Sequence, residues 1–489
     1  MKKFSIIIAF LCSNFIHANL NLENDIVLPK SNKTLRTFSG DLLNNESFHL
    51  IFTKNKISKK YEVFSFLFDG NTVVALPIFT SETDVNIVSF HQNKEMLTLL
   101  LSYKLKNKSF LKKIDFNLYK NSIQKSDPLV HDDFLTSVRL NNRSILVYKN
   151  DNNYIEIADF TSSLKPVLKR YTFISPKDSV KVFFKDKSVS SINTNEFVPN
   201  GAVNDVRLYF KDNKLFFTRD SEEPLKFNII GFDINSKKTN TTELLIFNLN
   251  NNLLSPQLSV FNNQNNQKYR KATSYVADNK LFQLALSKTE GYIKIHDINT
   301  NTTVNNFPLD ESLSKYIKNN DEFIGLPKFL KNASKNKYNA TLTVNKTTTD
   351  KLRLRIDYVD VTYNYNYNLW YHHQFIHQQF HNQFIQQNIQ RSIPSGFGPN
   401  FMDDEAFLSA TVLKQKRFFE VVLDVDCNLL EEDLPDSFYQ EIDKEMYIDN
   451  LEGNLKFKFE SSCFLKNNFR YIAYNIKDKN FVIHNTIIK

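Results

Sequence analysis

Three histidines spaced four residues apart are the residues of this sequence best arranged for metal chemistry. They are His373, His377 and His381, and they lie in a stretch, 370–390, that contains no charged residue. In a helix, side chains four positions apart share one face, and two imidazoles at that spacing can chelate zinc, copper or nickel. No glutamate lies between the histidines, and no cysteine or carboxylate nearby supplies a further kind of ligand.

The same stretch can instead be an amphipathic helix that docks on another surface. Ile376, Phe380 and Phe384 repeat at the same spacing beside the histidines, and the opposite face is Gln and Asn. A helix with one apolar face buries that face against a neighbouring surface. We therefore predict a Gln/His-rich docking helix without a bound metal, and keep the three histidines as the candidate ligands if a metal does bind.

Two groups of carboxylates could act as a cation site or as paired acids. Asp403, Asp404 and Glu405 follow a glycine-containing turn, and Asp424 and Asp426 alternate along a strand-like segment. Such acidic runs more often open a helix or face solvent. The chain has only 9 glycines and carries no phosphate-binding loop, dinucleotide fingerprint or nucleophile elbow. No catalytic residue is predicted.

The three cysteines raise the question of a disulfide. Cys12 lies in the apolar N-terminal segment, which leaves Cys427 and Cys463 if that segment is removed. An even pair in an exported chain favours a disulfide bond. We therefore predict a Cys427–Cys463 bridge, which depends on export.

The N-terminal segment, residues 1–18, is typical of a cleavable signal peptide. Lys2 and Lys3 precede a mostly apolar run from Ser5 to Ile16, and Ala18 offers a small residue for cleavage. The run is shorter than the roughly 20 residues that span a membrane; the alternative is an uncleaved buried helix. We predict export to the periplasm, the outer membrane or the cell exterior, and no transmembrane segment.

Composition favours a large β-rich protein. The chain has 489 residues, of which 41% are hydrophobic, and its 44 Phe and 21 Tyr are residue types enriched in strands. The formal net charge is +9, but lysines alternate with acidic residues along the chain. A nucleic-acid partner needs a clustered basic patch, so none is expected.

Short apolar runs separated by Asn, Asp, Lys and Ser fill residues 48–310. These runs have the length of strands, with turn-forming residues between them. Examples are Tyr61–Phe68, Val73–Phe79, Met96–Tyr103, Ser144–Tyr148, Tyr154–Ile157 and Val206–Phe210.

One pattern recurs within this region. Lys211–Phe216 and Ala277–Phe282 share Asp-Asn-Lys-Leu-Phe, and each is followed by an Asp-Ile-Asn turn, at Gly231–Asn235 and Ile295–Asn299; a poorer copy starts at Leu140–Ile145. Strand, turn, strand and a third strand ending at a turn form the meander of a β-propeller blade. The spacing exceeds the roughly 40–50 residues of common blades, so insertions are needed. A sandwich, another all-β form or an α+β form is the alternative.

The sequence predicts five regions. They are a signal peptide (1–18), a loosely packed lead-in (19–45), a propeller-like β domain (46–310), a linker with a strand and the Gln/His-rich helix (311–405), and C-terminal strands with a short acidic helix at 434–447 (406–489), which either close the propeller or stand apart.

Taken together, these features resemble exported propeller-like proteins of AT-rich Gram-negative bacteria. The likeness lies in the Lys-Lys signal, the Asp-Asn-Lys meanders, and a Tyr-Asn-Tyr strand that leads to the Gln/His helix and to Pro394–Pro399. It is a general likeness and implies no catalytic residue.

Three functions are compatible with these observations. The first is a non-enzymatic binding or scaffold protein of the cell envelope, without cofactor, whose partner is another envelope protein. The second is an exported receptor that binds a metal or another ligand. The third is a hydrolase that acts in the propeller channel, which requires carboxylates that converge in space.

Overall fold

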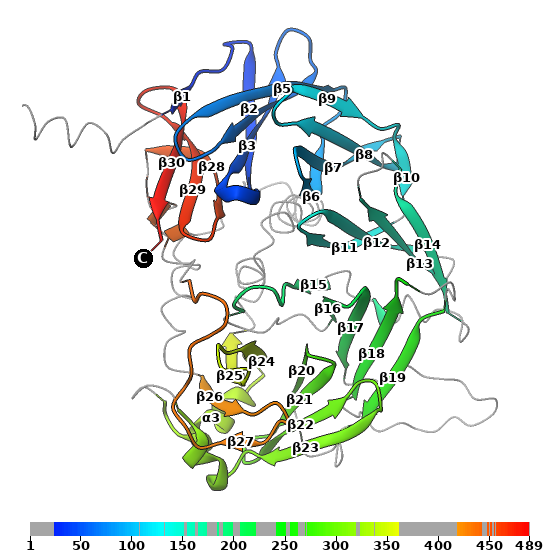
Figure 1. Cartoon of the computed structure of the whole chain (residues 1–489), viewed down its shortest axis with the longest axis vertical. Helices are drawn as coiled ribbons and strands as arrows, with labels where there is room; N and C mark the ends of the chain where they lie inside the picture. Colours follow the sequence, from blue (N-terminus) through cyan, green and yellow to red (C-terminus); the bar gives the residue numbers. More distant parts are fainter. Residues whose placement is uncertain are drawn as a thin grey trace, which may run out of the picture. The chain divides into compact units, whose positions relative to one another are not determined.

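The computed structural model describes residues 24–360 and 418–488, apart from short gaps. The gaps are 107, 132, 151–153, 162–164, 174–182, 185–188, 199–205, 222–240, 251–254, 263–268, 270, 319–322, 337, 443–446, 449, 452–453 and 455. Most of the described chain is β-strand, arranged in seven sheets of four or five strands (Figure 1). Within five of the seven sheets, every strand lies beside its neighbours in sequence, as in the blades of a β-propeller. The predicted propeller-like, mainly β fold is confirmed.

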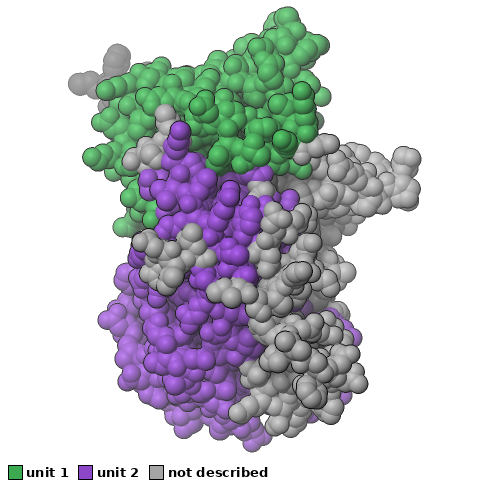
Figure 2. All heavy atoms as spheres, turned by 90° about the vertical axis from the view of Figure 1, so that its right-hand side faces the viewer, with its two compact units in different colours: residues 1–130, 140–143, 443–489 green, residues 131–139, 144–442 purple. Residues whose placement is uncertain are grey.

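The chain divides into two compact units. Unit 1 comprises Met1–Val130, Leu140–Arg143 and Asp443–Lys489, and unit 2 comprises His131–Arg139 and Ser144–Ile442 (Figure 2).

Unit 1 holds three of the sheets and one 3-10 helix, η1. Its elements are β1 (Asn24–Ile26), β2 (Asn32–Asp41), η1 (Leu43–Asn45), β3 (Ser47–Asn55), β4 (Tyr61–Phe68), β5 (Val73–Ser81), β6 (Asn86–Asn93), β7 (Met96–Leu105), β8 (Lys108–Asn117), β9 (Ser122–Lys125), β10 (Leu129–His131), β28 (Phe457–Phe464), β29 (Asn468–Asn475) and β30 (Asn480–Ile487). The sheets are β2 to β5, β6 to β10, and β28 to β30 completed by β1.

Unit 2 holds the other four sheets and two short helical segments. Its elements are β11 (Asp133–Leu140), β12 (Arg143–Asn150), β13 (Tyr154–Phe160), β14 (Val167–Thr172), β15 (Val189–Ile192), β16 (Val206–Lys211), β17 (Lys214–Ser221), β18 (Thr241–Asn248), β19 (Gln257–Asn262), β20 (Lys271–Ala277), β21 (Lys280–Leu286), β22 (Gly291–Asp297), β23 (Thr302–Pro308), η2 (Glu311–Tyr316), α3 (Leu326–Ala333), β24 (Tyr338–Lys346), β25 (Leu352–Asp360), β26 (Phe419–Leu423) and β27 (Leu429–Leu430). The sheets are β11 to β14, β15 to β19, β20 to β23, and β24 to β27, and β15 pairs in parallel with β16.

The two ends of the chain share one sheet. Strand β1 pairs antiparallel with β30, with Asn24 opposite Ile483 and Ile26 opposite Phe481. The first strand of the chain thus becomes the outer strand of its last blade. Residues 24–41, assigned from the sequence to a loosely packed lead-in, are therefore mostly strand, because β1 and β2 lie there.

The two Asp-Asn-Lys motifs occupy corresponding turns of neighbouring blades. Each joins the first and second strands of its sheet, β16 to β17 and β20 to β21. Asp212 and Asn213 have φ values of 48° and 57°, and Asp278 and Asn279 have values of 46° and 60°. Positive φ at both central residues defines the type I′ turn that Asn and Asp tolerate best. Lys211 donates to the Asp278 carboxylate across the two blades at 2.5 Å. The predicted repeat is confirmed.

The Asp-Ile-Asn motif belongs to a second set of equivalent turns. The Asp297 carboxylate accepts from the backbone N–H groups of Asn299 and Thr300 at 2.9 Å, between β22 and β23. The corresponding turns of other blades are closed in the same way by Asp69, Asn117, Asn248 and Asp424. The predicted counterpart at 231–235 lies outside the described residues, and Asn248 holds that position in its blade.

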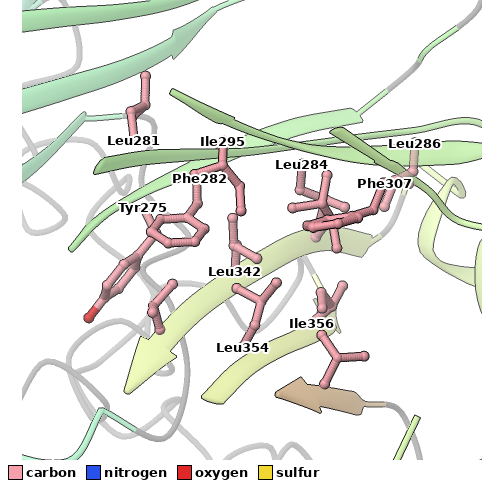
Figure 3. Close-up of a cluster of buried hydrophobic side chains, with 14 of the residues drawn as sticks. Tyr275, Leu281, Phe282, Leu284, Leu286, Ile295, Phe307, Leu342, Leu354 and Ile356 are labelled. Atoms are coloured by element: carbon pink, nitrogen blue, oxygen red, sulfur yellow. The ribbon is translucent and has the colours of Figure 1, made fainter. Parts of the chain in front are cut away.

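Each unit has its own apolar core. In unit 2 the core includes side chains from β21 and β22 of one blade and β24 and β25 of the next, such as Phe282, Ile295, Leu342 and Leu354, all at most 1% exposed (Figure 3). In unit 1, Ile51 and other side chains of β3 and β4 pack with side chains of β1, β29 and β30. Burial of such aliphatic and aromatic groups is the main force that holds adjacent blades together.

The segment after β27 differs from the prediction. Residues 434–442 form bends and a bridge between Ser437 and Thr347, with no helix among them. The Phe438 N–H donates to the carbonyl of Lys346 at 2.9 Å, so the segment crosses the end of β24. The acidic side chains there gave a helical pattern, but these backbone hydrogen bonds to the end of β24, in the same sheet as β27, override it. Across the described residues, no helix has the length and apolar character needed to cross a membrane.

Candidate functional site

A hollow of about 940 Å³ lies in unit 2, at one end of the blade formed by β20 to β23. It lies where β21 turns into β22 and where β23 leads through η2 to α3. In a propeller blade these two connections lie at the same end of the strands, so the topology brings them together. The hollow is lined by Tyr269, Lys288, Thr289, Glu290, Gly291, Tyr292, Lys294, Asn306, Pro308, Leu309, Asp310, Glu311, Ser314, Leu326, Pro327, Leu330 and Lys331.

The turn before β22 is fixed by a serine and a glycine. The Ser287 hydroxyl donates to the carbonyl of Glu290 at 3.0 Å and accepts from its N–H at 3.2 Å. A Cβ at Gly291 would lie 2.8 Å from Leu309 and 2.9 Å from the Ala285 carbonyl. The Leu309 N–H donates to Gly291 at 2.8 Å. Only glycine allows the end of β23 to lie this close to the start of β22.

The floor of the hollow is apolar and rigid. Leu309, Leu326 and Leu330 are each at most 4% exposed. Two of them lie on α3, which begins after Gly325 with Pro327 in its first turn, where a missing N–H costs no hydrogen bond. The buried residues of α3 recur at helical spacing, so one face of the helix belongs to the core and also forms the floor.

Two tyrosines form one wall. The rings of Tyr269 and Tyr292 lie 5.0 Å apart at 85°, an edge-to-face arrangement that stabilises aromatic pairs. Burial raises the pKa of both phenols, and in Tyr292 the neighbouring Tyr269 raises it further. Both side chains therefore stay neutral at physiological pH and present an apolar face with a polar tip.

Three lysines from separate elements carry positive charge to the hollow. Lys288 lies in the turn before β22, Lys294 on β22 and Lys331 on α3. Within the described part of the chain, none of the three ammonium groups lies in ion-pair distance of a carboxylate. The lining also holds three carboxylates, Glu290, Asp310 and Glu311, of which Asp310 accepts from Ser312 at the start of η2. The hollow combines an apolar floor, an aromatic wall and unpaired cations.

A serine–histidine contact elsewhere in the chain has the residue types of a catalytic pair. In unit 1, Ser39 Oγ lies 2.8 Å from His49 Nδ1, and Ser47 Oγ lies 3.1 Å from Nε2. Ser39 is 2% exposed and His49 is 0% exposed. Burial, and to a lesser extent Arg470, lowers the pKa of His49 to about 3. No substrate can reach this pair, which joins the strands it lies on through hydrogen bonds.

The two cysteines predicted to form a disulfide are not bonded to each other. Cys427 and Cys463 are both buried, and they belong to different compact units. Cys427 ends a turn after β26 and packs in the core of unit 2, whereas Cys463 lies on β28 opposite Arg470. The structure therefore lacks the predicted bridge, because each thiol is packed within its own unit.

The paired acids of the sequence analysis do not form an acid pair. Asp424 accepts from the N–H of Asn428 at 2.7 Å and from its side-chain amide at 3.0 Å. Burial raises the pKa of Asp424, but the hydrogen bonds from Asn428 outweigh this and lower it overall. It therefore acts as a turn residue. His373, His377, His381 and the acidic cluster at 403–405 lie outside the described residues.

No group of three His, Cys, Asp or Glu side chains that could hold a metal ion occurs among the residues that the structure describes. The three candidate histidines lie outside those residues, so metal binding by them stays a prediction.

Comparison with known proteins finds solved structures at low sequence identity and low TM-scores. No protein-family model matches the sequence, and no curated protein is detectably similar to it. Similar solved structures include the β-propeller domain of the Trilobed protease from Pyrococcus furiosus, at 9% identity and a TM-score of 0.24, covering 67% of this chain and 96% of that chain. They also include the Dos1 propeller, at 10% identity and a TM-score of 0.27, covering 64% and 65%.

A third similar structure is larger than this protein. It is prolyl oligopeptidase B from Galerina marginata, at 6% identity and a TM-score of 0.29. The match covers 91% of this chain but only 47% of the oligopeptidase chain. At these identities the likeness concerns the fold alone.

Proposed function

We propose that this protein is a non-enzymatic binding protein of the cell envelope, and that the hollow beside β22 and α3 is its ligand site. The observation that carries the proposal is the composition of the hollow. The buried leucines and the two tyrosines offer a ligand apolar contact area. The lysines of the lining can orient the ligand and select it through their charge. Concave sites with an apolar interior and a few placed polar groups are the usual form of binding sites.

The chemistry of the lining suits binding. The two phenols are neutral at physiological pH, and burial raises their pKa further above it. The lysines come from β22, from α3 and from a serine-closed turn, and α3 packs its apolar face in the core. A rigid scaffold that presents a preformed concave surface loses little conformational entropy when it binds.

The envelope location rests on the N-terminal segment. Residues 1–18 have the layout of a signal peptide, with Lys2 and Lys3 before the apolar run and Ala18 at its end. Strand β1 begins at Asn24, so cleavage before Asn19 leaves the strand that pairs with β30 intact.

Site-specific photo-crosslinking tests the proposal. A photoreactive phenylalanine analogue replaces Lys288 on the rim of the hollow in one variant. In the control variant, the same analogue replaces Lys56, an exposed residue in the corresponding turn of the blade β2 to β5. Illumination of intact cells should give a discrete crosslinked product from position 288 and none from position 56. Identical patterns from the two positions would show that the hollow is not the ligand site.

The receptor that binds a metal remains a separate candidate. It would use His373, His377 and His381. Zinc titration by calorimetry on the wild type and on His377→Ala tests it, and indistinguishable isotherms would rule it out.

A further inference from the structure

We propose that one end of unit 1 binds the surface of an anionic lipid membrane, with lysines facing the headgroup phosphates and exposed aliphatic side chains entering the interface. This inference goes beyond the proposed function and concerns a surface other than the hollow. It is argued from the turns that the three sheets of unit 1 bring to that end, from their charge and from their exposed apolar residues.

Hydrogen bonds join the turns of two blades at this end. The N–H of Lys56, in the turn between β3 and β4, donates to the carbonyl of Ser31, in the loop between β1 and β2, at 2.7 Å. That loop follows β1, which pairs with β30, so it also lies beside the turn between β29 and β30. In that turn the Ile476 N–H donates to the carbonyl of Lys456, just before β28, at 3.0 Å.

The blade β6 to β10 contributes the turn between β7 and β8 to the same end. Arg36, in the first half of β2, pairs with Asp84, just before β6, at 2.9 Å. At the other end, the N–H of Leu43, after β2, donates to the side chain of Gln92, near the end of β6, at 2.6 Å. Strands β2 and β6 therefore run in the same direction. Because β7 is antiparallel to β6, the turn at 104–108 lies at the end where β6 begins.

The segments at this end are strongly basic. They contain 13 lysines and five carboxylates, and they are residues 25–33, 54–62, 81–86, 103–109, 456–458 and 474–480. Two of the carboxylates are in ion pairs, Glu82 with Lys60 and Asp84 with Arg36. The segments at the opposite end contain three lysines and four carboxylates, and they are residues 40–47, 67–74, 92–97, 116–123 and 464–469. The fold thus gathers lysines that are dispersed in the sequence at one end of unit 1, here called the basic end.

Exposed aliphatic side chains lie among these lysines. Ile57 is 83% exposed and Val27 is 77% exposed, the two highest values among the large hydrophobic residues in the described part of the chain. Leu105 and Ile476 are also exposed, and each is next to a lysine in sequence. At a lipid surface, such apolar groups enter the acyl boundary while neighbouring ammonium groups contact anionic headgroups. Nucleic-acid bases are usually bound by aromatic and arginine side chains, so these aliphatic residues favour lipid.

Flotation with lipid vesicles tests the inference. The full-length protein, as isolated from cells, is mixed with vesicles of phosphatidylglycerol and phosphatidylcholine, or of phosphatidylcholine alone. One double variant, Lys30→Glu with Lys56→Glu, alters the basic end. The control double variant, Lys120→Glu with Lys466→Glu, makes the same change of net charge at the opposite end, and all four lysines are exposed.

A second matched pair tests the aliphatic contact. Ile57→Ser removes the most exposed aliphatic residue of the basic end, and Tyr119→Ser removes a residue at the opposite end that is 67% exposed. In both turns the backbone N–H of the replaced residue donates to the side chain of an asparagine two positions earlier. These hydrogen bonds do not involve the replaced side chain, so serine leaves both turns intact.

The wild type should bind the vesicles that contain phosphatidylglycerol and should not bind phosphatidylcholine alone. Rising salt should weaken this binding. The double variant of the basic end should bind about thirtyfold more weakly or less, since each lysine near an anionic surface contributes about fivefold. Ile57→Ser should weaken binding severalfold because less apolar surface enters the interface. Both control variants should bind as the wild type does.

Three results would overturn the inference. The first is a wild type that does not bind the anionic vesicles. The second is undiminished binding by the double variant of the basic end, which would assign binding to another part of the chain, such as the apolar N-terminal segment. The third is binding to duplex DNA that Ile57→Ser leaves unchanged, without binding to vesicles.

None of these results depends on the hollow, whose photo-crosslinking test stands independently. A crosslink from position 56 to a phospholipid adds too little mass to give a discrete product on a gel, so position 56 remains the control there.

Discussion

The Lys211 ammonium group lies 2.5 Å from the carboxylate of Asp278, although the two residues belong to different blades. The Lys346 ammonium group lies 2.9 Å from the same carboxylate and comes from the blade on the other side. One aspartate, in a turn that the sequence repeat predicted, thus links three consecutive blades of unit 2.

This arrangement predicts the cost of two substitutions at one position. Asp278 has a φ of 46°, so Asp278→Ala should lower the free energy of unfolding by about 1–2 kcal/mol through backbone strain, and by up to about 1 kcal/mol for each lost ion pair. Asp278→Gly loses the ion pairs without the strain and should be the milder change. Urea unfolding of the two variants measures the difference, and equal losses would refute the role of the turn conformation.

The same carboxylate predicts a dependence on pH. Burial raises the pKa of Asp278, but hydrogen bonds from Lys211 and Lys346 outweigh this and lower it below its usual value. A depressed folded pKa gives stability that is present above the unfolded pKa and is lost as the pH falls through the folded pKa. Asp278→Asn should therefore be less stable than wild type at neutral pH, and the difference should shrink in acid. A difference that stays constant down to pH 2 would contradict this.

Two glycines with positive φ should respond differently to alanine. Gly70 has a φ of 108°, and a Cβ there would lie 2.8 Å from Nη2 of Arg470. Arg470 is 1% exposed and donates to Ser47 and to the Phe68 carbonyl, so it has little freedom to move. Gly325 has a φ of 85° with no atom within 4 Å of the added Cβ.

Gly70→Ala should therefore destabilise more than Gly325→Ala. Both substitutions carry a backbone cost of about 1–2 kcal/mol. Gly70→Ala should add about 1–2 kcal/mol because it disturbs the hydrogen bonds of a buried guanidinium. Urea unfolding, followed separately for each unit by local fluorescent labels, provides the measurement. A larger loss from Gly325→Ala would contradict the packing argument.

His49 should make stability fall in mild acid. Its folded pKa is about 3, against a usual value of 6.5. As the pH falls below 6.5, the unfolded chain binds a proton that the folded chain does not bind until about pH 3. Stability therefore decreases across that window, by at most about 1.4 kcal/mol per pH unit. His49→Gln should show a shallower slope in unfolding curves between pH 6.5 and 4, and unchanged slopes would contradict it.

Intact mass spectrometry tests export and the thiols together. Removal of residues 1–18 takes Cys12 with it, so two cysteines remain. Because the structure has both as free thiols, unfolded and unreduced protein should take up two alkyl groups on a chain that begins at Asn19. A chain that retains Met1 would contradict export. A chain that takes up no alkyl group before reduction would contradict the absence of a disulfide.

Local sequence features predicted the strands and their turns well. The run Tyr61–Phe68 coincides with β4, and the Asp-Asn-Lys motifs form the turns expected of them, because apolar runs of strand length and turn chemistry are local properties. The pairing of β1 with β30 was not predictable, since three residues at one end of the chain carry no mark of their partner strand. The acidic segment at 434–442 was misassigned because its hydrogen-bond partners lie on β24.

The candidate site could not be predicted from the sequence, because its residues come from separate elements that only the fold brings together. Lys288, Lys294 and Lys331 are ordinary lysines in a lysine-rich chain, and only the fold brings them to one hollow. Gly291 was the one available signal, since glycine is scarce in this chain and this one follows a polar turn. The cysteines were paired by elimination, and the structure places them in separate cores.

The hollow as the ligand site is the central claim, and blocking it is the most direct test. The partner captured by crosslinking from position 288 is titrated by calorimetry into the wild type, Ser314→Trp and Val304→Trp. Val304 is 39% exposed on β23, the strand that also supplies Asn306 and Pro308 to the lining, but it lies outside the hollow. The account predicts that Ser314→Trp abolishes the binding heat and that Val304→Trp binds as the wild type does. Wild-type affinity in Ser314→Trp would contradict it.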